Sequence, residues 1–270
     1  MNPAVGVVGA GRMGLPLIGH LARKGFRTFA TDLDASKRAK VEERGASWTE
    51  DAAALAALCE VVLVCVGYDH ELRELLQDPR VAAAMRQGAI YAVLSTVHPK
   101  TVQALAAQCV QRGIHVVDAT MCRGGKAADE GTLLSFVGGD AAVVERLRPV
   151  LGAFSSDVVH TGGVGSAQVA KAVNNLIMWA CLVADHEGLA LAQRYGVDVQ
   201  KLRQALLMSS AANNALANWG LQTIAWAEDD MAIVAEMAAE CGLALPQAGL
   251  TREICGALKP QRYKLERYGR

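Results

Sequence analysis

Short apolar runs alternate with amphipathic stretches over the first 160 or so residues of the chain. Strands are predicted at 4–8, 26–31, 61–66, 89–94 and 114–117, and helical segments near 15–25, 34–44, 69–77 and 99–112. Continuous apolar strands are typical of a parallel sheet that is buried on both faces. The alternation therefore predicts an α/β domain with a doubly wound sheet, which the apolar runs 133–137 and 158–160 are expected to extend.

The pattern changes after the glycines at 162, 163 and 165. Ser166 is a good cap for a helix that is predicted to run unbroken to about Tyr195, and almost all of its residues are apolar. No strand pattern follows. We therefore expect two domains, 1–161 and 162–270, the second all-helical and joined to the first through the long helix.

A glycine-rich turn, Gly9-Ala-Gly-Arg-Met-Gly14, follows the first strand and opens a helix. In the dinucleotide fingerprint the first glycine allows a tight turn, the second lets the pyrophosphate approach the backbone, and the third lets the helix pack closely. The helix N-terminus then offers amide donors to the phosphates. This motif makes 1–161 a dinucleotide-binding domain, with Gly9, Gly11, Arg12, Met13 and Gly14 as cofactor-binding residues.

The second strand ends at Asp32, where an acid can accept hydrogen bonds from a ribose 2′-hydroxyl and repel a 2′-phosphate. The next residue is Leu33 rather than an arginine that could hold that phosphate. NAD is therefore the expected cofactor and NADP the less favoured one. Lys37 and Arg38 are expected to be solvated.

Ligands of open parallel sheets bind at the carboxyl ends of the strands. Three stretches follow predicted strands at this edge: 67–69, 95–99 and 118–125. Val66, Gly67 and Thr96 are candidate cofactor contacts.

The chain has 52% hydrophobic residues and a formal net charge of zero, which suits a globular protein and argues against a general nucleic-acid surface. Seven cysteines without metal-ligand spacing predict reduced thiols and no metal site. We expect a cytoplasmic protein without a signal peptide, because the first strand begins close to Met1. No membrane span is expected, because the long helix carries Lys171, Asp185 and Glu187.

One lysine, Lys171, lies in the second turn of the long helix, and Asn175 follows on the same face. A lysine among apolar neighbours can exchange a proton with a substrate, whereas its commonest role is to reach water from a surface.

Four landmarks in order make the chain resemble the β-hydroxyacid dehydrogenase family, which includes 3-hydroxyisobutyrate dehydrogenase and tartronate semialdehyde reductase. They are the fingerprint with Pro16, the loop Ser95-Thr96 with Pro99, the stretch from Asp118-Ala119 through Gly124 to Gly131-Thr-Leu133, and the helix start from Gly165 through Lys171 to Asn174-Asn175. The resemblance implies hydride transfer between NAD(P) and the hydroxyl carbon of a small hydroxy acid. It also implies that Lys171 is the general acid/base and that Asn175 orients the lysine or the substrate.

The chain also departs from the family pattern. Cys122 and Arg123 replace a Ser-Gly pair that holds the substrate carboxylate, Thr120 replaces a proline, and Asp229 replaces a lysine beside the nicotinamide. We expect Cys122, Arg123 and Gly124 to contact the substrate, with Asn213 and Asn214 from the helical domain. Arg123 could instead pair with Asp129 or Glu130, and Cys122 could simply pack.

The favoured function is an NAD-dependent 3-hydroxy acid dehydrogenase that acts as a homodimer or homotetramer. Two alternatives remain open: an enzyme similar to imine reductases, which typically have Asp or Tyr at the position of Lys171, and a dinucleotide-binding module without catalysis.

Overall fold

The computed structural model describes residues 2–269, and the chain divides into two compact units, Met1–Lys171 and Ala172–Arg270. The division falls within the long helix α9 (Ser166–Arg194), which therefore contributes to both units. The boundary that the sequence suggests, between residues 161 and 162, stays a prediction.

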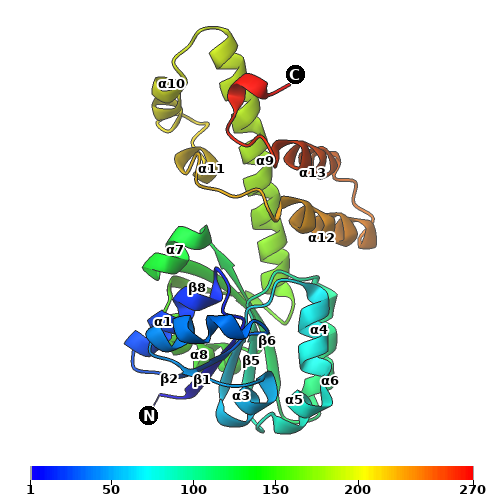
Figure 1. Cartoon of the computed structure of the whole chain (residues 1–270). Helices are drawn as coiled ribbons and strands as arrows, with labels where there is room; N and C mark the ends of the chain where they lie inside the picture. Colours follow the sequence, from blue (N-terminus) through cyan, green and yellow to red (C-terminus); the bar gives the residue numbers. More distant parts are fainter. Residues whose placement is uncertain (1, 270) are drawn as a thin grey trace. The chain divides into compact units, whose positions relative to one another are not determined.

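The first unit is a sheet of eight strands in the order β3-β2-β1-β4-β5-β6-β7-β8 (Figure 1). All neighbouring strands are parallel except β6 and β7, which are antiparallel. The strands are β1 (Ala4–Val8), β2 (Arg27–Thr31), β3 (Ser47–Trp48), β4 (Val61–Val64), β5 (Ile90–Val93), β6 (His115–Cys122), β7 (Leu133–Gly138) and β8 (Ser155–Gly162). The expected doubly wound α/β class is confirmed, and both apolar runs at 133–137 and 158–160 belong to the sheet.

Helices connect these strands and cover both faces of the sheet. They are α1 (Gly14–Arg23), the 3₁₀ turn η1 (Ala35–Lys37), α2 (Arg38–Glu43), α3 (Ala52–Leu58), α4 (Asp69–Gln77), α5 (Pro79–Ala84), α6 (Pro99–Val110), α7 (Gly124–Glu130) and α8 (Ala141–Leu151). The sequence pattern does not predict β3, α3, α5, α7 or α8. Most of these are short, and α3 is almost entirely alanine and leucine, so it shows no clear apolar periodicity.

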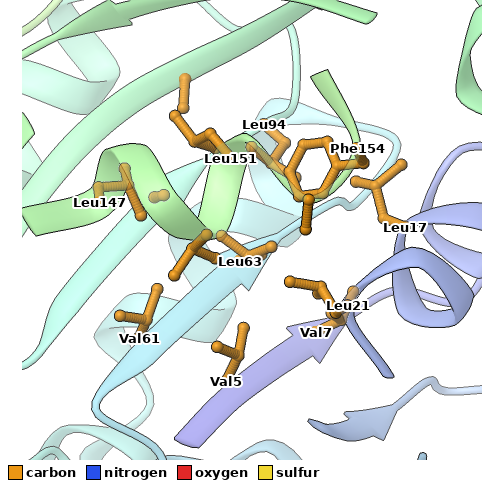
Figure 2. Packing of buried hydrophobic residues seen from close by; sticks show 14 of the residues in the cluster. Val5, Val7, Leu17, Leu21, Val61, Leu63, Leu94, Leu147, Leu151 and Phe154 are labelled. Carbon is orange, nitrogen blue, oxygen red and sulfur yellow. The ribbon is translucent and has the colours of Figure 1, made fainter. Parts of the chain in front are cut away.

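Alternate residues of each central strand enter different hydrophobic cores, because successive side chains of a strand point to opposite faces. Val61 and Leu63 of β4 pack with α1 and α8 in one core, part of which Figure 2 shows. Val62 and Val64 pack with α3, α4 and α6 in the other. Burying a side chain of this size stabilises the fold by roughly 1.5–3 kcal/mol.

Strand β6 is longer than its apolar run predicts. The sequence pattern ends the strand at residue 117 and makes the stretch 118–125 a loop. Residues Asp118–Cys122 instead pair with Leu134–Gly138 of the antiparallel strand β7. The sequence pattern misses this part of the strand because it contains polar residues. The pattern also cannot show that β7 provides the backbone hydrogen bonds for it.

The second unit contains helices and, within its described residues, no strand, as expected. Besides most of α9 these are α10 (Val199–Leu206), α11 (Asn214–Ala217), α12 (Ala227–Glu240), α13 (Pro246–Leu258) and the 3₁₀ turn η2 (Leu265–Arg267). Trp179 and Leu182 of α9 pack against α12 and α13 in the larger of two cores. By length and composition alone α9 could also cross a membrane, with a mean hydropathy of 1.3, a property that core helices of soluble proteins share.

His186 of α9 lies at the centre of an aromatic cluster in this unit and is almost fully buried. Its ring lies 4.4 Å from that of Trp219 and 5.3 Å from that of Tyr263. The backbone amide of Tyr263 donates to Nε2 at 3.1 Å, so Nδ1 carries the proton and donates to the carbonyl of Leu182 at 2.7 Å. Burial lowers the pKa of His186, because a charged ring would lose its hydration there.

This buried histidine predicts that the second unit loses stability in mild acid. The unfolded chain takes up a proton near the ordinary histidine pKa of about 6.5, while the folded ring resists protonation until a lower pH. The contribution of neutral His186 to the free energy of unfolding is therefore complete above a pH of about 6.5. It is lost as the pH falls towards the lower pKa of the folded state. We expect a slope of at most about 1.4 kcal/mol per pH unit in urea unfolding followed by tryptophan fluorescence. His186→Gln should flatten that slope, whereas the control His70→Gln, at an exposed position of α4, should retain it.

Candidate active site

The turn after β1 has the geometry that its glycines require. Gly9 has a φ of +100°, and a Cβ on it would lie 2.3 Å from the carbonyl oxygen of Cys65. A Cβ on Gly14 would lie 1.9 Å from the oxygen of Gly9, so α1 approaches the end of β1 as closely as a bare backbone allows. Among the described residues, nothing lies within 4 Å of a Cβ on Gly11, which leaves open space above the turn.

The first turn of α1 is available to an anion. Met13 precedes α1, and within the described part of the chain no side chain caps the amides that begin this helix. Unsatisfied amides at a helix N-terminus carry partial positive charge and bind phosphate groups. Together with the open space at Gly11, this arrangement fits the diphosphate of a dinucleotide.

Asp32 lies at the end of β2 with its side chain 11% exposed, and it already holds three donors. Its Oδ2 accepts from the amide of Ala10 at 2.7 Å and from Nζ of Lys37 at 2.9 Å, and its Oδ1 accepts from the amide of Asp34 at 2.9 Å. Burial alone would raise the pKa of Asp32, but these hydrogen bonds outweigh it and lower the pKa. A carboxylate offers about four lone-pair positions, so room remains for about one ribose hydroxyl.

Lys37 corrects one expectation from the sequence. The sequence predicts a solvated side chain, but that of Lys37 is only 29% exposed and forms the ion pair with Asp32. The 3₁₀ turn η1 brings it back over the end of β2, a fold of the chain that helix periodicity does not reveal. Arg38, the next residue, is exposed as expected and pairs with Glu42.

The loops after β4 and β5 are tied together by side chains. Ser95 donates its hydroxyl to the carbonyl of Val66 at 2.8 Å, and the amide of Gly67 donates to Glu71 at 2.7 Å. Thr96 is half-buried between the buried residues Ser95 and Val97. Of the expected cofactor contacts, Val66, Gly67 and Thr96 therefore lie on neighbouring loops at the carboxyl edge of the sheet.

Asp118 of β6 caps the N-terminus of α9. Its Oδ1 accepts from the amide of Gly165 at 2.8 Å and its Oδ2 from the amide of Gln168 at 2.9 Å. The carboxyl is fully buried, and burial raises its pKa against the opposing effect of the amide hydrogen bonds. Ser166, the cap predicted from the sequence, is instead the first residue of the helix, and its hydroxyl bonds with that of Thr161 at 2.8 Å.

Gln168 connects the helix to the loop after β5. Its Nε2 donates to the carbonyl of Ser95 at 2.8 Å and its Oε1 accepts from the amide of Val97 at 3.0 Å. Thr120 of β6 also donates its hydroxyl to the carbonyl of Ala167 at 3.0 Å. The first turn of α9 is thus bound to two strand ends by buried hydrogen bonds.

Lys171, one turn after Ala167, is half-buried. Its Nζ donates to the carbonyl of Met121 at 2.7 Å, near the end of β6. The amine therefore lies beside the turn that follows β6, with its position set by the cap of the same helix. Cys122 lies next to it and is buried, and burial raises the pKa of the thiol although the charges of Lys171 and Arg123 oppose that shift. The thiol stays protonated at neutral pH.

Arg123 has the left-handed φ of 82°, which is unfavourable for any residue except glycine. Its Nη1 donates to the carbonyl of Thr132 at 3.0 Å and to the hydroxyl of Ser156 at 2.8 Å, and it pairs with Asp157 at 2.8 Å. The acidic partner is thus neither Asp129 nor Glu130, the two that the sequence suggests. The antiparallel pairing of β6 with β7 brings the end of β6 close to the start of β8, where Asp157 lies. Gly124 follows with a φ of +75° and is exposed.

Three further candidate residues belong to the second unit. Asn175 is buried, and its Oδ1 accepts from Asn174 at 3.0 Å. Asn213 caps α11 by accepting from the amide of Leu216 at 2.8 Å, and it donates to Asp185 at 3.0 Å. Asn214 is exposed and accepts from Asn218. Within residues 2–269 no group of three or more histidine, cysteine or acidic side chains could hold a metal ion.

The sequence does not reveal the roles of Asp118, Gln168 and Thr120. Asp118 stands out in it only as part of a family landmark, and Gln168 lies between Gly165 and Lys171 without a distinguishing signal. The feature that could have indicated the role of Asp118 is an acid in an otherwise apolar run, because a buried carboxylate requires donors. Nothing in the sequence indicates that Gln168 bonds with a loop some 70 residues away.

Two family models match the chain in succession. Residues 4–163 match the NAD binding domain of 6-phosphogluconate dehydrogenase, and residues 165–266 match the model described as NAD-binding of NADP-dependent 3-hydroxyisobutyrate dehydrogenase. A 3-hydroxyisobutyrate dehydrogenase from Pseudomonas aeruginosa is 30% identical over 213 residues, which cover 78% of this chain and 72% of that protein. An NAD-dependent L-serine dehydrogenase from the same organism is 29% identical over 213 residues, with 78% and 71% covered.

A solved structure, Mycobacterium tuberculosis 3-hydroxyisobutyrate dehydrogenase with L-serine, has a similar fold, with a TM-score of 0.88 and 22% identity over 97% of this chain and 95% of that one. Solved imine reductases share the fold too. The family models and the Pseudomonas 3-hydroxyisobutyrate dehydrogenase match the sequence as well as the fold, so they show which family the chain belongs to. The chain therefore belongs to the β-hydroxyacid dehydrogenase family and is an NAD(P)-dependent dehydrogenase that acts on CH–OH groups.

Proposed function

We propose that this enzyme oxidises a small 3-hydroxy acid, or reduces the corresponding semialdehyde or keto acid, with NAD as the preferred cofactor and Lys171 as general acid/base. One observation carries the proposal: the amine of Lys171 is held by the carbonyl of Met121 at the turn after β6. The two Pseudomonas relatives are named for 3-hydroxyisobutyrate and L-serine, both of which are 3-hydroxy acids.

Each residue has a defined part in this chemistry. Gly11 and the first amides of α1 bind the diphosphate, and Asp32 accepts a hydrogen bond from the adenine ribose. The nicotinamide, when bound, exchanges the hydride with the substrate carbon. Lys171 takes the hydroxyl proton during oxidation and returns it during reduction. Asn175, one turn further along α9, orients the lysine or the substrate.

Carboxylate recognition is assigned to the side chain of Arg123 and to the backbone of the turn formed by Cys122, Arg123 and Gly124. The Arg123–Asp157 pair is about half exposed on both sides, so it contributes little free energy and can be exchanged for a substrate carboxylate. The buried thiol of Cys122 serves as a packing group. Asn213 and Asn214 remain proposed substrate contacts of the helical unit.

Assembly and location also remain proposals. Exposed apolar side chains of α9, including Val173 and Ile177, support a homodimer or homotetramer. A cytoplasmic location is consistent with seven free cysteines.

The test of the function is NADH formation against 3-hydroxy acids, 3-hydroxy amino acids and amines. Activity on 3-hydroxy acids supports the proposal. Turnover confined to amines would favour the alternative related to imine reductases, and NADH binding without any turnover would favour the non-catalytic module.

Replacing Lys171 should separate catalysis from cofactor binding. Lys171→Ala should lower kcat by roughly 10² to 10⁴ and leave the Kd for NADH within a few-fold. Lys171→Arg keeps the charge but cannot release its proton at neutral pH, so it should be similarly impaired. Asn175→Ala should have a smaller effect. Stopped-flow kinetics and fluorescence titration measure both quantities, and turnover by Lys171→Ala close to wild type would contradict the assigned role.

The Asp32–Lys37 pair predicts how the enzyme discriminates between cofactors. We expect kcat/KM to favour NAD over NADP by at least about tenfold, or roughly 1.4 kcal/mol. Lys37 partly neutralises Asp32, so Lys37→Ala should raise that preference by about three- to tenfold because the unpaired carboxylate repels a 2′-phosphate more strongly. Arg38→Ala, on the same segment but bound to Glu42, is the matched control and should leave the ratio unchanged. An NADP preference in wild type would overturn the assignment.

Arg123→Gly tests carboxylate binding at little cost in stability, because glycine adopts the φ of 82° without strain and the ion pair that is lost is about half exposed. The KM for the best hydroxy acid should rise about ten- to a hundredfold, roughly 1.4 to 2.8 kcal/mol, with kcat changed much less. Thermal unfolding should show a variant at least nearly as stable as wild type. An unchanged KM would limit Arg123 to its contacts within the protein, with Thr132, Ser156 and Asp157.

A further inference from the structure

Helix α7 begins at Gly124, in the turn proposed to bind the substrate carboxylate. Two side chains hold this helix, Arg12 from the glycine turn after β1 and His20 from α1. Arg12 donates from Nη1 and Nη2 to the two carboxylate oxygens of Asp129, at 2.8 and 2.7 Å. His20 of α1 lies with its Nε2 3.0 Å from the carbonyl oxygen of Ala128. Both contacts connect α1 and its preceding turn to the last turn of α7.

Two glycines allow this close approach. A Cβ on Gly125 would lie 2.7 Å from Nη2 of Arg12, and a Cβ on Gly131 would lie 2.8 Å from Cε1 of His20. The guanidinium of Arg12 therefore lies directly over the first turn of α7, at Gly125. The arginine thus contacts both ends of this short helix.

Arg12 also belongs to the turn that accepts the diphosphate, between Gly11 and Gly14. A guanidinium binds phosphate through parallel hydrogen bonds at least as well as it binds a carboxylate. The present partner is held weakly: the side chains of Arg12 and Asp129 are 62% and 54% exposed, and such surface pairs contribute about 0–1 kcal/mol. One guanidinium thus has two possible anionic partners on different sides.

We propose that Arg12 is a positioning residue that exchanges Asp129 for the dinucleotide diphosphate and thereby couples cofactor binding to α7. Without a dinucleotide, Arg12 holds α7 against the cofactor turn. With the dinucleotide bound, Asp129 loses that contact and the turn at Gly124–Gly125 is free to adjust to a substrate. The exchange itself needs only the NAD(P) dependence of the family, whereas its consequence for the substrate rests on the carboxylate-binding turn of the proposed function.

Binding of NADH by four proteins tests the exchange: wild type, Asp129→Asn, Arg12→Ala and the double variant. Asp129→Asn should tighten NADH binding by about two- to fivefold, because Arg12 no longer has to leave a carboxylate. Arg12→Ala should weaken it by about tenfold. In the Arg12→Ala background, Asp129→Asn should change the Kd by less than about 1.5-fold. ADP-ribose, which carries the diphosphate without the nicotinamide, should give the same pattern.

A purely structural pair predicts the opposite sign, because Asp129→Asn would then leave NADH binding unchanged or weaker. Equal tightening in both backgrounds would mean a general charge effect and would also overturn the exchange. Arg80→Ala, which removes an exposed arginine that pairs with Asp51 and Asp78, is the control and should leave the Kd within about twofold. A wild-type protein that does not bind NADH would instead count against the cofactor itself.

Hydrogen exchange provides a second measurement. NADH should speed exchange of the amides in residues 124–131 of wild type by about two- to fivefold, while Asp129→Asn should exchange at the faster rate without NADH. Slower amide exchange in wild type on NADH binding would show that Arg12 stays paired with Asp129 when the cofactor is bound, and it would overturn the proposal.

Discussion

The buried carboxylate of Asp118 is the contact on which the geometry of the site depends. A fully buried acid is unfavourable unless donors surround it, and here the amides of Gly165 and Gln168 at the start of α9 supply them. The helix N-terminus carries partial positive charge, so the same contact stabilises both groups. Gln168 also bonds to the loop after β5, so the first turn of α9 is fixed relative to the ends of β5 and β6. The position of Lys171, one turn further along the helix, follows from this.

Several charged groups that could meet a ligand already have a partner in the protein. Lys37 covers Asp32, Asp129 holds Arg12, and Asp157 holds Arg123. The last two pairs are about half exposed and therefore weak, so the proposed replacement of Asp129 by a phosphate and of Asp157 by a carboxylate costs little. The Asp32–Lys37 pair is more buried, so water screens its two charges less than those of the other pairs.

The turn after β6, to which we assign carboxylate recognition, differs chemically from the pattern of its family at Cys122 and Arg123. Cys122 is buried as a neutral thiol, and Arg123 adopts a left-handed conformation that a glycine would adopt without strain. Strained backbone persists where the surrounding structure over-determines it, and here the contacts of Arg123 with Thr132, Ser156 and Asp157 do so. The side chain of Arg123 thus makes the left-handed backbone unfavourable, and its contacts also hold the backbone in that conformation.

The sequence by itself determined the α/β class, the glycine turn, Asp32 and the long helix with Lys171, because each depends on local periodicity or on a motif confined to a few neighbouring residues. Only the tertiary structure decided that β6 continues to Cys122, that Asp118 rather than Ser166 caps α9, and which partners Lys37, Arg12, Arg123 and Gln168 choose. Many of these partners lie tens of residues or more from each other in sequence. Strand pairing and hydrogen bonds across such distances depend on which elements meet in space, and no pattern within one segment contains that information.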